Sequence, residues 1–252
     1  MRSTTTWRVG IGVALTWSAL TACTVAPAPS DSETAYGGAS VRVGSDDELR
    51  AGLSSLVPAS PSASPGFAAA RERLARLEVK GRAPNTGYRR SVFGRAWSDD
   101  VDVAMGRNGC RTRDDVLRRD LTDVRMSGKC RVMSGWLDDP YTGGRIRFER
   151  GVDVKAIQID HVVALGDAWR TGAQEWAPQK RLEFANDPRN LQTTAGWANQ
   201  RKKAGNAATW LPPEKGYRCT YVARQIEVKA AYGLWVVAPE RDAMNRVLAT
   251  CD

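Results

Sequence analysis

The sequence contains one histidine, His161, among its 252 residues. A metal site built from several histidines is therefore excluded, and a catalytic triad of the Ser-His-Asp kind would have to use this one residue. A lone histidine is more often structural than catalytic, so the residues around His161 must decide its role.

Cysteine is also scarce, and none of the five cysteines forms a C-x-x-C pair. This spacing argues against a zinc site. When Cys23 is set aside, for the reason given below, an even number remains, which fits disulfide bonds in an exported protein. Four cysteines allow three pairings, of which closeness in the chain favours Cys110–Cys130 and Cys219–Cys251.

Long apolar runs are lacking as well. The apolar stretch 9–22 follows Arg2 and Arg8, and it is too short to cross a hydrocarbon core of about 30 Å. Residues 1–22 are therefore predicted to be a signal peptide. The sequence Leu-Thr-Ala-Cys that ends at Cys23 looks like a bacterial lipobox, which implies a lipid on Cys23. The protein would then be exported and anchored to the outer face of the cytoplasmic membrane; ordinary secretion with release is the alternative.

Acidic residues are outnumbered by basic residues in the C-terminal part of the chain. The formal net charge is +9, and residues 1–22 carry +2 and residues 23–67 carry −3, so residues 68–252 carry +10. The Ala, Pro, Ser and Gly content of residues 23–66 predicts a tether, with a short helix over 45–56. Residues 67–252 are then the folded domain, and their positive charge suits a polyanionic partner.

Hydrophobic periodicity predicts an α+β domain with more helix than strand. Strands are expected at 131–137 and 145–148, joined as a hairpin, and at 154–161 and 190–194. Helices are expected at 67–79, from 112, over 165–176, 179–185, 195–203 and 221–232, and from 239.

Three short motifs stand in a fixed order on these elements. Asp160-His161 closes a predicted strand, Asn190-Leu191 starts the next, and Asn199-Gln200-Arg201-Lys202 lies in the following helix. This order resembles the HNH nuclease family, also called the ββα-metal fold. The neighbouring residues 184–188 and 210–213 resemble one branch, the secreted actinobacterial HNH proteins related to the C-terminal domain of GmrSD restriction endonucleases. The resemblance runs from about residue 88 to 251, and it implies a helix-rich single domain around an HNH ββα-metal core, stapled by two disulfides.

The resemblance also implies a role for each motif residue. His161 would be the general base, because an imidazole with a pKa near 6.5 accepts a proton from water at neutral pH. Asp160 and Asn199 would bind one divalent ion, Mg²⁺ or Mn²⁺, since magnesium completes its octahedron with water and substrate phosphate. Asn190 would brace the loop that carries the base. Asn199 stands where the third motif letter is often His. Asn is an accepted variant at this position, and it leaves open a weaker or more selective metal site.

Basic and aromatic residues near these motifs offer further candidates. Arg201, Lys202 and Lys203 are predicted to contact phosphates, although cations also suit the C-terminal end of a solvated helix. Four tryptophans offer stacking surfaces for bases, but their apolar neighbours favour a core role: Trp169, Trp176, Trp197 and Trp210.

The leading hypothesis is a metal-dependent endonuclease that hydrolyses phosphodiester bonds of extracellular nucleic acid, with DNA ahead of RNA. An immunity protein that guards the producing cell is a further candidate partner, and the oligomeric state stays open. The alternative is a catalytically silent surface lipoprotein that binds nucleic acid or envelope polyanions through the same basic domain. A solute-binding lipoprotein is disfavoured because the chain is short for two lobes.

Overall fold

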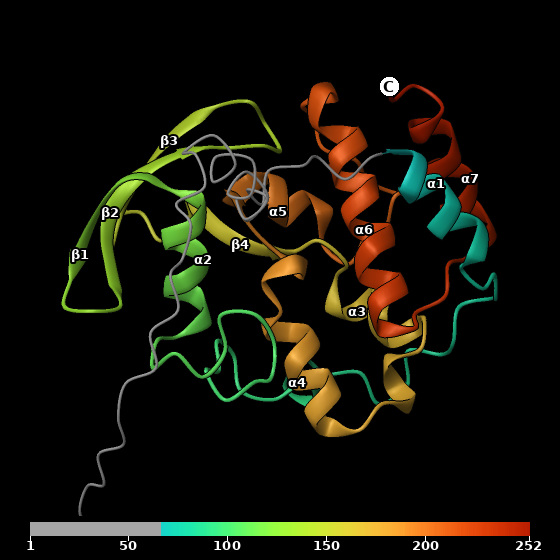
Figure 1. The fold of residues 1–252 in the computed structure, drawn as a ribbon, viewed down its shortest axis with the longest axis horizontal. Helices are drawn as coiled ribbons and strands as arrows, with labels where there is room; N and C mark the ends of the chain where they lie inside the picture. Colours follow the sequence, from blue (N-terminus) through green and yellow to red (C-terminus); the bar gives the residue numbers. More distant parts are fainter. Residues whose placement is uncertain (1–66) are drawn as a thin grey trace, which may run out of the picture. The chain divides into compact units, whose positions relative to one another are not determined.

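The computed structural model of the protein describes residues 67–252, shown in Figure 1. The predicted signal peptide, Cys23, the tether and the helix over 45–56 lie outside the described residues. The described part is an α+β domain with more helix than strand, as predicted. None of its helices combines the length and apolar character that a membrane span requires.

The helices and strands of the described domain follow one another in a mixed order. The α-helices are α1 (Phe67–Arg76), α2 (Thr112–Asp120), α3 (Leu165–Arg170), α4 (Pro178–Asn186), α5 (Gly196–Lys202), α6 (Arg218–Tyr232) and α7 (Ala238–Leu248). The strands are β1 (Thr122–Ser127), β2 (Arg131–Asp138), β3 (Arg145–Glu149), β4 (Ile157–His161) and β5 (Leu191–Ala195). Short 3₁₀ helices are η1 (Arg90–Phe93), η2 (Ala173–Glu175), η3 (Pro188–Asn190) and η4 (Lys215–Tyr217).

Two predictions about these elements were wrong. The strand β1 was not expected, because none of its side chains is fully buried and its apolar alternation is weak. The helix expected over 165–176 is interrupted after α3, where Gly172 adopts a φ of 129° and the chain continues as η2. A φ in this range is open to glycine and strained for other residues, so the helix cannot run through this point.

The strands form two separate antiparallel sheets. The sheet β1-β2-β3 contains the predicted hairpin, and β4 pairs with β5 in the other sheet. Helix α2 contacts both β2 and β5. Apolar side chains from α2 and from both sheets, such as Val116, Val132 and Ile157, share one buried cluster.

The C-terminal helices form the other half of the domain. Helix α6 packs against α1 and α7 (Figure 1), and its buried face includes Tyr221 and Ile226. The disulfide Cys219–Cys251 joins the start of α6 to the segment after α7. The second disulfide, Cys110–Cys130, joins the segment before α2 to the turn between β1 and β2. Both predicted pairings are confirmed.

Strands β4 and β5 and helix α5 form a ββα unit. In the antiparallel pair, Ile157 lies opposite Ala195 and His161 lies opposite Leu191. Helix α5 begins directly after β5 and contacts both strands. Gly196 makes this abrupt turn possible, because a Cβ atom there would lie 1.8 Å from the carbonyl oxygen of Lys155. The ordered motifs of the sequence therefore meet in one compact unit.

Candidate active site

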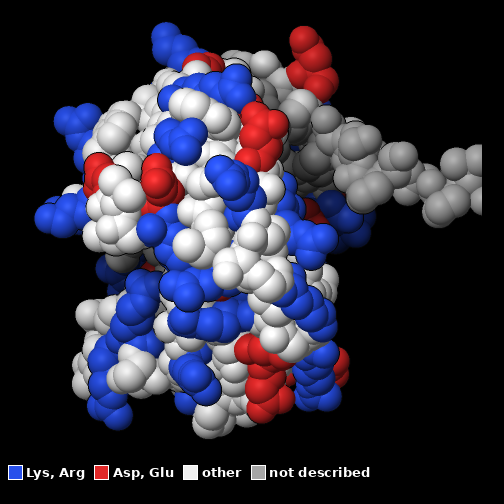
Figure 2. Space-filling view, turned by 90° about the vertical axis from the view of Figure 1, so that its left-hand side faces the viewer, with Lys and Arg blue, Asp and Glu red and all other residues white. Residues whose placement is uncertain are grey.

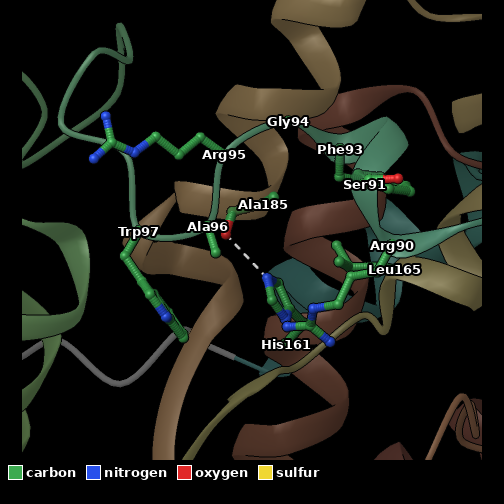
Figure 3. A pocket seen from close by; sticks show the side chains of 10 residues that line it. All are labelled: Arg90, Ser91, Phe93, Gly94, Arg95, Ala96, Trp97, His161, Leu165 and Ala185. Atoms are coloured by element: carbon green, nitrogen blue, oxygen red, sulfur yellow. Dashed lines mark hydrogen bonds between the residues drawn. The ribbon is translucent and has the colours of Figure 1, made fainter.

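His161 is the last residue of β4, and its imidazole is nearly buried. Its Nε2 atom lies 2.9 Å from the carbonyl oxygen of Ala185, as Figure 3 shows. Ala185 belongs to the last turn of α4, where backbone carbonyls have no partner within the helix. The end of α4 therefore fixes the orientation of the ring.

This contact also decides which ring nitrogen carries the proton. A carbonyl oxygen only accepts hydrogen bonds, so Nε2 is the donor and Nδ1 is the nitrogen left to accept a proton. The pKa of His161 is lowered from its ordinary value to about 3, first by burial and then by the positive charge of Arg90. The ring is therefore neutral at physiological pH.

Asp160 is buried beside His161 and is held by two partners. The Tyr141 hydroxyl donates to Oδ2 at 2.8 Å, and the Lys202 ammonium donates to Oδ1 at 3.0 Å. Lys202 also donates to the backbone oxygen of His161 at 2.7 Å. Burial raises the pKa of Asp160, while Lys202 opposes this effect. The ammonium thus compensates the buried carboxylate and ties α5 to the end of β4.

Asn190 fixes the backbone that follows His161. Its Oδ1 accepts from the backbone N–H of Val163 at 2.8 Å, and its Nδ2 donates to the Val163 carbonyl at 3.2 Å. The Asn190 backbone oxygen accepts from the N–H of Val162 at 2.8 Å. The side chain is fully buried, so this asparagine holds the loop after the histidine without contacting solvent.

A polar cavity of about 260 Å³ brings the motif residues together. We define this polar cavity by the lining residues Tyr88, Arg90, Asp160, His161, Asn199 and Lys203. It collects the end of β4, the end of α5 and the start of η1. Asp160 and His161 are neighbours in the chain, yet both reach this cavity because the strand ends at His161.

The polar cavity offers oxygen ligands to a cation. Asn199 donates through Nδ2 to Gln158 Oε1 at 3.0 Å, which leaves its amide oxygen as the ligating atom. One carboxylate and one amide oxygen fit Mg²⁺ or Mn²⁺, which keep water and phosphate in their remaining positions. Within residues 67–252, His, Cys, Asp and Glu side chains nowhere gather in threes as they do around a metal held only by protein. The donor set therefore fits a weakly held, oxygen-preferring ion, since Lys202 already neutralises Asp160.

The three basic residues predicted to contact phosphate do not share one environment. Arg201 is exposed, with its guanidinium 5.8 Å from the centre of the Trp197 ring, and Lys203 lines the polar cavity. Lys202 is buried in its ion pair with Asp160, so the prediction of a phosphate contact is wrong for this residue. Consecutive helical residues point in different directions, and the middle one of this run faces inward.

Arg90 is a site residue that the sequence did not single out. It is exposed, lines the polar cavity and lies beside the His161 ring in Figure 3. Arg90 comes from η1, far from the motifs in the chain, and no local pattern separates it from surface arginines. Only its position beside the single histidine could have marked it.

The four tryptophans named above also differ in their surroundings. Trp169, Trp176 and Trp210 pack against apolar clusters, as predicted. Trp197 is 49% exposed on α5, so the core interpretation is wrong for it.

The domain surface is electropositive on the side of the β1-β2-β3 sheet. Figure 2 shows lysine and arginine side chains over much of this face, with acidic side chains in smaller groups. Exposed arginines of these strands are Arg125, Arg131, Arg145 and Arg147. Such a surface attracts a polyanion at long range.

Comparison with known proteins agrees with this geometry. A family described as the C-terminal domain of GmrSD restriction endonucleases matches residues 111–247, which include β4, β5 and α5. The chain is also 36% identical over 197 residues to an uncharacterized secreted protein of Arthroderma benhamiae, a match that covers 77% of this chain and 90% of the relative. No solved structure matches the chain.

The family points to a nuclease-related hydrolase whose substrate is nucleic acid, and such nucleases generally use divalent metal ions. The two disulfides and the secreted relative fit an extracellular protein. The chain therefore belongs to the family of GmrSD restriction endonuclease C-terminal domains.

Proposed function

We propose that this protein is a metal-dependent endonuclease of the HNH type that cleaves extracellular DNA, with RNA as a second substrate. The observation that carries the proposal is the polar cavity, where Asp160, His161 and Asn199 come together. The basic residues Arg90 and Lys203 line the same cavity. The buried Asn190 supports the same interpretation, since it fixes the loop after the base.

The chemistry follows from the residues around this cavity. Nδ1 of His161 accepts a proton from a water molecule as the water oxygen attacks phosphorus. The bond from phosphorus to the departing sugar oxygen breaks, and that oxygen takes a proton from solvent. Arg90 and Lys203 attract the phosphate oxygens by charge. Burial is the larger cause of the lowered pKa of His161, and the positive charge of Arg90 is the smaller one. A phosphate beside Arg90 opposes only this smaller effect.

Asp160 and Asn199 would hold the divalent ion in this proposal. When bound, such an ion supplies positive charge for the developing negative charge on the phosphate and the leaving oxygen. Asp160 contributes the carboxylate and Asn199 a neutral amide oxygen, so the loss of Asp160 should harm metal activation more than the loss of Asn199.

The decisive experiment measures plasmid cleavage by the purified full chain with Mg²⁺, with Mn²⁺ and with EDTA. We expect cutting only with a metal ion, and a loss of about a hundredfold or more for His161→Ala, the usual weight of general base catalysis. DNA affinity should barely change in this variant, because phosphate neutralisation supplies most of it.

A matched pair of variants separates a site effect from a folding effect. Asp160 and Asp167 are both buried and both pair with a lysine, at 3.0 and 2.9 Å. Asp167 does not line the polar cavity. Asp160→Asn should therefore abolish metal-dependent cutting, while Asp167→Asn should cut DNA in proportion to its folded fraction. Wild-type protein that binds DNA but never cuts it would instead favour the silent surface lipoprotein.

The proposal includes attachment to the membrane through Cys23. Two acyl chains attach a protein stably where a single chain is marginal. Replacing Cys23 with Ser should release the protein into the medium or leave the precursor unprocessed. Fully soluble wild-type protein whose N-terminus lies at another residue would contradict the anchor. Co-purification from the producing cell would test for an immunity protein.

A further inference from the structure

A second cavity adjoins the polar cavity on the other side of His161. It also measures about 260 Å³, and we define this apolar cavity by Arg90, Phe93, Ala96, Trp97, His161 and Leu165. Phe93 and Leu165 are buried. Figure 3 shows Trp97 and the His161 ring on facing sides of this cavity, with Arg90 beside the ring. Arg90 and His161 thus belong to both cavities.

Most residues that line the apolar cavity come from the segment 90–97, which precedes the part of the chain that matches the family. Gly94 has a φ of 77°, and a Cβ atom there would lie 2.7 Å from Leu182 of α4. The segment is therefore seated closely on α4. Trp97 also has a positive φ, 59°, which is uncommon and strained for a bulky residue. Strain of this kind gathers at ligand sites, where the surrounding structure holds it.

The lining of the apolar cavity selects for a particular ligand chemistry. None of its lining residues is acidic, and Arg90 and Arg95 supply positive charge at its edge. Its volume of about 260 Å³ lies just below the usual range for ligand pockets, roughly 300 to 1,000 Å³, so it suits one ring system rather than a large molecule. A flat apolar group joined to a phosphate fits this combination of an aromatic wall and basic residues.

We infer that the apolar cavity binds one unpaired nucleobase of the strand whose phosphate lies in the polar cavity. The inference rests on the proposed function, because it assigns the neighbouring cavity to the same substrate. A base within a duplex is stacked and paired, and it must leave the stack to enter such a cavity. The protein therefore prefers single-stranded or locally unpaired nucleic acid over intact duplex.

The test is equilibrium binding in EDTA, so that the result does not depend on cleavage. The probes are a short single strand, a strand of the same length built from abasic residues, and a duplex of the same sequence. Ala96 lines the apolar cavity and is exposed, so Ala96→Trp should obstruct the cavity without removing a core side chain. This variant should lower affinity for the single strand about tenfold, within the range of one stacked base, and leave the abasic strand and the duplex unchanged.

The exposed Trp197 on α5 provides the matched control. Trp197→Ala should prefer the single strand over the abasic strand as much as wild type does, because Trp197 does not line the apolar cavity. The inference is overturned if Ala96→Trp binds the single strand as tightly as wild type does. It is also overturned if all three probes weaken equally, or if only Trp197→Ala removes the preference for bases. Absence of cleavage with Mg²⁺ would refute the proposed function in a separate assay, while base-dependent binding would still be measured.

Discussion

Replacing Lys202 with Met should destabilise the domain through one buried charge. The ammonium side chain is fully buried and pairs with Asp160 at 3.0 Å, where the carboxylate is also buried. Methionine keeps most of the side-chain volume but removes the charge and both hydrogen bonds. Asp160 would then be left as a buried carboxylate whose remaining partner is the Tyr141 hydroxyl.

The size of the effect follows from two limits. Breaking a buried ion pair by removing one partner costs about 3 to 5 kcal/mol. Asp160 can also lose its charge by taking up a proton. Protonating a carboxyl group with an ordinary pKa of about 3.9 costs about 4 kcal/mol at pH 7. The two values agree. At pH 5 the same protonation costs only about 1.5 kcal/mol, so the penalty should shrink as the pH falls.

Urea and thermal unfolding of the full chain in EDTA measure this loss. A loss of 3 to 5 kcal/mol corresponds to a fall of roughly 6 to 20 °C in Tm for a domain of this size. The double variant Asp160→Asn, Lys202→Met should recover much of the loss, because it leaves no unpaired charge. Mg²⁺ added to Lys202→Met should raise its stability more than that of wild type, since the free carboxylate binds the ion better.

Lys229 supplies the matched control for the metal effect. It pairs with Asp167 and Glu240 in the interior, away from the polar cavity. Lys229→Met should lose at least as much stability, without any rescue by Mg²⁺. The reasoning is refuted if Lys202→Met lies within about 1 kcal/mol of wild type at pH 7, or if Mg²⁺ rescues both variants equally.

Three further predictions concern stability and charge. Burial raises the pKa of three tyrosines in the core, Tyr141, Tyr221 and Tyr232. Above pH 10 the unfolded chain therefore releases protons that these residues keep in the folded chain, and the free energy of unfolding should fall by about 4 kcal/mol per pH unit, measured by urea midpoints and tyrosinate absorbance. Replacing both cysteines of either disulfide with Ala should lower the free energy of unfolding by about 3 kcal/mol, since the bridged cysteines are 20 and 32 residues apart. Unchanged unfolding midpoints of these double variants would contradict this. Lys203 has a φ of 53° at the end of α5, so Lys203→Gly should stabilise the fold by up to about 1 kcal/mol. The same variant should cleave DNA more slowly than wild type, and cleavage at the wild-type rate would show that Lys203 does not act in the site.

The sequence alone predicted the order of the ββα unit and favoured the cysteine pairing that the structure then settled. Both depend on local information: a strand that ends in Asp160-His161, a second that follows Asn190, and cysteines close enough in the chain to meet. The same local patterns predicted most helices. They missed β1, whose exposed residues carry little periodicity, and the interruption at Gly172, where a Cβ atom would lie 3.3 Å from the Trp235 ring.

The tertiary structure alone decided which charged residues serve the site. Arg201, Lys202 and Lys203 look equivalent in the sequence, yet only Lys202 meets a buried carboxylate, 42 residues earlier in the chain. Arg90 and Trp97 become candidate site residues because the fold places them around the same cavity as His161, with η1 packed against α4. Periodicity reports which face of an element is buried, whereas the partner of a buried charge is set by long-range packing, and no local spacing encodes that partner.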